Sequence, residues 1–167
     1  GPRQVGKTTV LRQLMDSNRE YVTLDDFDER SLAKRDPAMF LQIHSTPIMI
    51  DEVQYAPELF SYIKMEIDKG AEPGTYWLTG SQAFKLMELA QESLAGRVAI
   101  LHMSSLSQHE IYGSGDCTPF TLELGALKAR EKTNAPADIA EIYDRIWNGS
   151  MPGLASGKFS DRDVFYS

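Results

Sequence analysis

The first nine residues, GPRQVGKTT, constrain the fold more than any other stretch of the chain. Gly1, Gly6, Lys7 and Thr8 satisfy the pattern G-x-x-x-x-G-K-[ST], in which glycines let the backbone curl so that N–H groups point at phosphate oxygens. Lys7 would reach the β- and γ-phosphates of ATP, and the Thr8 hydroxyl would bind Mg²⁺. We expect a phosphate-binding loop that opens a helix. Its predicted nucleotide contacts are Gly1, Pro2, Arg3, Gln4, Val5, Gly6, Lys7, Thr8 and Thr9.

The stretch PIMIDE contains an apolar run, Ile48–Ile50, that ends in two acidic residues, Asp51 and Glu52. Such a run is typical of a strand buried on both faces of a parallel sheet, with charge at its carboxyl end. Carboxylate oxygens there suit a Mg²⁺ ion that keeps most of its water shell, so Asp51 is the predicted metal partner. Glu52 is the predicted catalytic base, which would orient or deprotonate the water attacking the γ-phosphate.

Two further polar positions are candidates for the same site. Ser81 follows the strand signal in TYWLTGSQ, where a hydroxyl or amide can face the γ-phosphate, although any polar residue from Thr79 to Gln82 could take this place. Arg97 could sense charge or act as an arginine finger toward a neighbouring subunit, and a structural ion pair is an equal alternative. With Lys7 and Glu52, Ser81 and Arg97 complete the predicted catalytic set.

Strand and helix signals alternate along the first part of the chain. Strands are expected over 21–26, 47–52, 75–80 and 97–103, with amphipathic helices between them. This alternation predicts an α/β fold, a doubly wound parallel sheet flanked by helices, with ligands at the carboxyl ends of the strands. After Ser104 only helical patterns appear, around 122–130 and 139–147. We therefore expect an α/β core over 1–104 and a helical region over 105–167.

Composition excludes several classes of protein. Seventeen basic and 24 acidic side chains give a net charge of −7, which opposes a broad electrostatic surface for nucleic acid or anionic lipid. The single cysteine, Cys117, cannot form an internal disulfide, and no apolar stretch approaches the length of a membrane span. We expect a cytoplasmic location and no membrane partner.

With the loop, IMIDE, LTGSQ and LAGR in this order, the chain resembles the AAA+ ATPase domain of bacterial and archaeal ATP-binding proteins that carry a DUF4143 domain. The resemblance implies a P-loop NTPase fold, Walker A at Gly1–Thr8, Walker B at Asp51 and Glu52, a sensor residue within 79–82, and the pair Gly96-Arg97. It also implies a strand before the loop and a further domain after the ATPase. Both are missing from this chain, so we expect a piece of a longer protein that binds ATP better with its first strand restored.

The expected function is ATP binding and hydrolysis that couples nucleotide state to conformational change in a larger protein. A module or scaffold gated by nucleotide but unable to hydrolyse it is the main alternative. A phosphoryl-transfer kinase fits less well because Glu52 beside Asp51 favours water as the nucleophile, and a GTPase would need an Asn-Lys-x-Asp stretch. A homo-oligomer stays open, as does contact with nucleic acid through the full-length protein.

Overall fold

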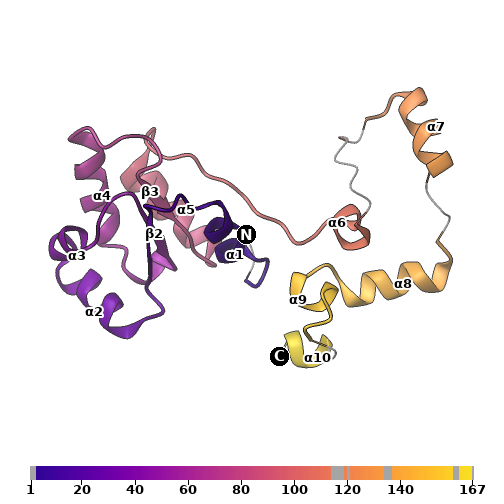
Figure 1. Cartoon of the computed structure of the whole chain (residues 1–167), viewed down its shortest axis with the longest axis horizontal. Helices are drawn as coiled ribbons and strands as arrows, with labels where there is room; N and C mark the ends of the chain where they lie inside the picture. Colours follow the sequence, from indigo (N-terminus) through magenta and orange to yellow (C-terminus); the bar gives the residue numbers. More distant parts are fainter. Residues whose placement is uncertain (1–2, 114–118, 120, 134–136, 160–161, 167) are drawn as a thin grey trace. The chain divides into compact units, whose positions relative to one another are not determined.

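The computed structural model describes residues 3–113, 119, 121–133, 137–159 and 162–166. Backbone contacts divide the chain into two units, Gly1–Ser104 and Ser105–Ser167. Figure 1 shows the helices and strands of both units. Over the described ranges, every helix is too short or too polar to cross a bilayer.

The first unit is built on a small parallel sheet. Its strands are β1 (Glu20–Thr23), β2 (Ile48–Asp51) and β3 (Tyr76–Leu78), and they lie side by side in the order β1-β2-β3. The register pairs Thr23 with Asp51 and Ile50 with Leu78. Every residue of the central strand β2 is buried, as the apolar run Ile48–Ile50 predicts.

Helices pack around this sheet in the first unit (Figure 1). Asp26 caps the second helix, α2 (Phe27–Arg35), and Asp36 caps the third helix, α3 (Pro37–Ile43). Each aspartate accepts at least one hydrogen bond from the N–H groups of the first helical turn. The third helix packs against the second and fourth, and the fourth packs against the fifth. The elements are α1 (Lys7–Leu14), α2 (Phe27–Arg35), α3 (Pro37–Ile43), the 3-10 turn η1 (Val53–Tyr55), α4 (Leu59–Asp68) and α5 (Ala83–Leu94).

The hydrophobic core lies between these helices and the sheet. Phe40, Phe60 and Ile63 are among its largest fully buried side chains, and they come from α3 and α4. Because the helices are short, their stability depends on burying this apolar face. The buried cluster contains Val22, Leu24, Ala33, Phe40, Ile48, Ile50, Val53, Ala56, Leu59, Phe60, Ile63, Ala90 and Leu94.

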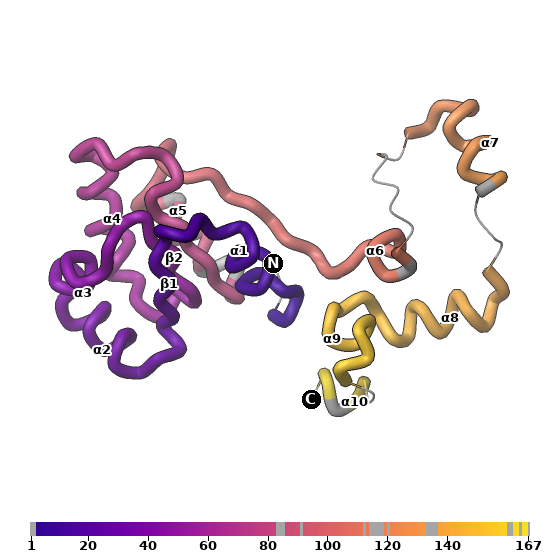
Figure 2. The backbone as a smooth tube through the Cα atoms, viewed as in Figure 1, coloured from indigo at the N-terminus to yellow at the C-terminus, as the bar shows by residue number. Residues whose placement is uncertain are grey.

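The predicted strand over 97–103 is wrong. Residues 98–103 form neither strand nor helix, and Figure 2 shows them as an extended stretch of tube after α5. The segment has the apolar content of a strand, but a strand also needs a neighbour for its N–H and C=O groups. Among the described residues, no strand pairs with it, and Val98, Ile100 and Leu101 are exposed.

The three other predicted strands are confirmed, and the sheet is parallel. A doubly wound sheet requires the strand order to reverse at some point. The described strands follow one another in chain order without reversal. The structure therefore supports an α/β fold with a parallel sheet, and double winding stays a prediction.

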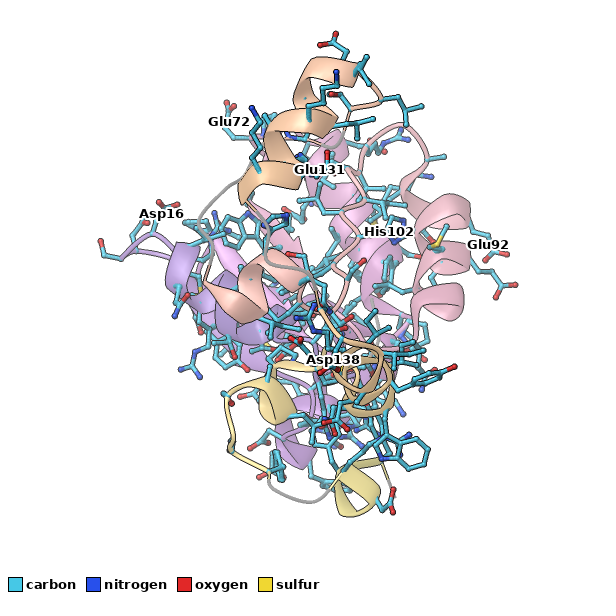
Figure 3. All side chains as sticks on the ribbon, turned by 90° about the vertical axis from the view of Figure 1, so that its right-hand side faces the viewer. Asp16, Glu72, Glu92, His102, Glu131 and Asp138 are labelled. Carbon is cyan, nitrogen blue, oxygen red and sulfur yellow. The ribbon has the colours of Figure 1, made fainter. Side chains whose placement is uncertain are left out.

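The second unit is helical in its described parts. A capping box joins Ser107 and Glu110 at the start of its first helix, and Asp138, labelled in Figure 3, caps the helix over 139–148. The predicted apolar face of that helix is present, and Ile139, Tyr143 and Ile146 are exposed. The elements are α6 (Gln108–Tyr112), α7 (Leu124–Thr133), α8 (Ile139–Asn148), α9 (Pro152–Ala155) and α10 (Arg162–Tyr166).

Candidate functional site

The glycine-lysine loop leads directly into α1, as the sequence predicts. Gly6 precedes the helix with φ 88°, in the left-handed region that glycine adopts without steric cost. Val5 is buried and anchors the loop, whereas Arg3 and Gln4 are exposed. Thr9 lies in the first turn of α1 and is exposed. The predicted contacts Gly1 and Pro2 lie outside the described residues.

A hydrogen bond joins the two predicted metal-binding residues. The hydroxyl of Thr8, in the first turn of α1, donates to Oδ2 of Asp51 at 2.9 Å across 43 positions of sequence. Asp51 is the last residue of β2 and is 6% exposed. A hydroxyl and a carboxylate are hard oxygen donors, the type that Mg²⁺ prefers. The donor set therefore fits a Mg²⁺ ion that retains water ligands.

Lys7 lies in the electric field of both predicted acidic residues. Burial lowers the pKa of Lys7, while the carboxylates of Glu52 and Asp51 raise it and the charge of Arg3 lowers it. Burial disfavours the ammonium form and neighbouring carboxylates favour it. A phosphate anion bound beside Lys7 would favour the ammonium form further.

Glu52 has a left-handed backbone, with φ 55° and ψ 42°, immediately after β2. Non-glycine residues rarely adopt this conformation, and it turns the chain sharply into η1. Oε2 of Glu52 accepts from the backbone N–H of Ser81 at 3.2 Å and from its hydroxyl at 3.1 Å. The structure thus brings together Glu52 and Ser81, which the sequence predicts at the ends of separate strands.

Arg97 makes a structural ion pair. Its Nε lies 2.6 Å from Oδ1 of Asp68 on α4, and a terminal nitrogen donates to the carbonyl of Ala95. These contacts correspond to the structural alternative that the sequence left open. They do not test a role toward a neighbouring subunit, which stays a prediction.

Two residues that sequence reasoning missed also contact the acidic pair. The hydroxyl of Tyr21, on β1, donates to Oδ2 of Asp51 at 3.1 Å, and the side-chain amide of Gln54 donates to Oε2 of Glu52. Burial raises the pKa of Tyr21 and the Asp51 carboxylate raises it further, so the phenol keeps its proton and remains a donor. The contact of Tyr21 with Asp51 depends on the register of β1 against β2, which a local sequence pattern does not specify.

The carboxyl ends of β2 and β3 and the start of α1 therefore meet at one place, where a hydroxyl, an ammonium and two carboxylates gather. The sequence model of the AAA domain family matches residues 1–112. The chain belongs to this family. Membership makes it a nucleotide-binding module of the ATPase type, and it confirms the resemblance drawn from the motifs.

Two curated relatives are similar to this chain over part of its length. They are the uncharacterized proteins Mb2031c of Mycobacterium bovis and Rv2008c of Mycobacterium tuberculosis, each 38% identical over 117 residues. The match covers 68% of this chain and 26% of each relative, so the chain matches about a quarter of their length. No solved structure matches the chain significantly.

Proposed function

We propose that this chain binds ATP with Mg²⁺ and hydrolyses its γ-phosphate. The observation that carries the proposal is the contact between Thr8 and Asp51, with Lys7 and Glu52 beside it. Thr8 and Asp51 would hold the Mg²⁺ ion, which neutralises charge on the β- and γ-phosphates. Lys7 would contact the same phosphates, and the loop N–H groups would bind their oxygens.

In this proposal Glu52 acts as the general base. A water molecule attacks the γ-phosphorus as its proton passes to the Glu52 carboxylate, and the bond to the oxygen between the β- and γ-phosphorus breaks. The products are ADP and inorganic phosphate. Ser81 donates two hydrogen bonds to one oxygen of Glu52, which supports a defined orientation of the carboxylate.

The test is Glu52→Gln in the full-length protein. The amide keeps the shape of the side chain but cannot take a proton from water, so kcat should fall about 100-fold or more while Mg-ATP affinity stays within about threefold. Glu58→Gln, at an exposed position without a side-chain capping bond, is the matched control and should hydrolyse ATP normally. Phosphate release and nucleotide titration measure the two effects separately.

Hydrolysis at the parent rate in Glu52→Gln would remove the base from the mechanism. A parent protein that binds Mg-ATP without releasing phosphate would instead favour the nucleotide-gated module or scaffold. We further propose that nucleotide state drives a conformational change in the full-length protein. A second copy of the protein, in a homo-oligomer, or a nucleic acid would be its binding partner.

A further inference from the structure

Gln54 is a buried polar residue to which the proposed mechanism gives no role. It lies in η1, two positions after Glu52, and is 2% exposed. Its amide nitrogen donates to Glu52, but its amide oxygen Oε1 is buried and has no hydrogen-bond partner among the described residues. A buried acceptor without a partner costs free energy that an apolar side chain of similar size would avoid. Stability alone therefore does not explain a glutamine here.

The carboxylate of Glu52 determines which way the Gln54 amide faces. A carboxylate only accepts hydrogen bonds, so the amide must present its NH₂ group to Glu52 and direct Oε1 away. That oxygen lies against Gly80, where an added Cβ would come within 2.1 Å of it. Gly80 thus leaves the room that this orientation of Gln54 requires.

The hydrogen bonds to Glu52 are distributed unequally between its two oxygens. Oε2 accepts from the amide of Gln54 and from the N–H and hydroxyl of Ser81. No hydrogen bond within the described part of the chain uses Oε1 of Glu52. With Oε2 occupied by donors from two sides, the carboxylate plane is held and Oε1 remains available to a water molecule.

We infer that Gln54 is a positioning residue that holds the Glu52 carboxylate so that Oε1 faces the attacking water. The inference rests on the proposed function. Gln54 acts through Glu52, and its side chain makes no hydrogen bond to the loop or to Asp51 in the described structure. Without it, Ser81 holds Oε2 from one side only and the carboxylate can rotate. Misplacement of a reacting group by about 1 Å can cost roughly 100-fold in rate.

The first test is Gln54→Met in the full-length protein, because methionine keeps the length and volume but lacks the amide donor. We expect kcat for Mg-ATP hydrolysis to fall about 10- to 100-fold, with KM, nucleotide affinity and melting temperature close to the parent values. Gln42→Met, on the exposed side of α3, is the matched control. A rate equal to that of the parent overturns the positioning role.

A double variant separates positioning from general structure. If Gln54 acts through Glu52, Gln54→Met combined with Glu52→Gln should be no slower in single turnovers than Glu52→Gln alone, since the base is already absent. A further loss in the double variant would show that Gln54 has a structural role independent of Glu52.

Gly80 supplies a second route in case Gln54→Met does not fold. In Gln54→Ala with Gly80→Ala, the methyl group added at position 80 enters the space that the Gln54 amide leaves. This double variant should therefore fold and bind Mg-ATP, but hydrolyse it about 10- to 100-fold more slowly than the parent protein. Parent-like turnover in this variant overturns the inference alone. Absence of turnover in the parent protein overturns the proposed function and the inference with it.

Discussion

Lys7 is the side chain on which nucleotide affinity should depend most. Lys7 is partly buried and feels the charges of Glu52 and Asp51, and a bound phosphate would be its strongest partner. We predict that Lys7→Ala weakens Mg-ATP binding about 10- to 100-fold, which corresponds to one lost charged hydrogen bond. Lys34→Ala, on the exposed side of α2, is the control. Fluorescent nucleotide titration measures both, and unchanged affinity in Lys7→Ala would remove this residue from the site.

Helices α2 and α3 are joined to the sheet by His44, which directly follows α3. Its Nδ1 lies 2.7 Å from Glu20 on β1 and its Nε2 lies 2.9 Å from Glu29 on α2, with the side chain 8% exposed. We predict that His44→Ala lowers the free energy of unfolding by about 1–3 kcal/mol, because the carboxylates of Glu20 and Glu29 both lose their contact with the imidazole. His102→Ala, at the exposed residue labelled in Figure 3, is the control. Equal urea midpoints for the two variants would contradict this role.

At the scale of the whole molecule, apolar side chains are distributed unequally between the two units. Ile63 in the first unit is fully buried, whereas Ile142 on α8 is 45% exposed. We predict that Ile63→Ala lowers the free energy of unfolding by about 2–5 kcal/mol, because it leaves a cavity in the core. Ile142→Ala should change it by less than about 0.5 kcal/mol. Similar losses in denaturant titrations would show that the apolar face of α8 is covered in solution.

Local signals determined much of the fold and the composition of the candidate site. Glycine at position 6 and the helical pattern after it specify the loop and α1, because backbone conformation and capping depend on neighbouring residues. The apolar run before Asp51 specifies a buried strand with a carboxylate at its end. Ligands of such a sheet bind at the carboxyl ends of its strands, so the sequence alone could predict that the phosphate-binding loop with Thr8 lies close to Asp51 and Glu52.

Only the tertiary structure decided which side chains complete that edge. Tyr21 reaches Asp51 because of the register between β1 and β2, and Gln54 reaches Glu52 because Gly80 leaves room for its amide. The residues over 97–103 have a strand-like composition and still form no strand, since pairing needs a neighbour. Register, close approach and pairing each join segments far apart in the chain, and a local sequence pattern carries no information about such distances.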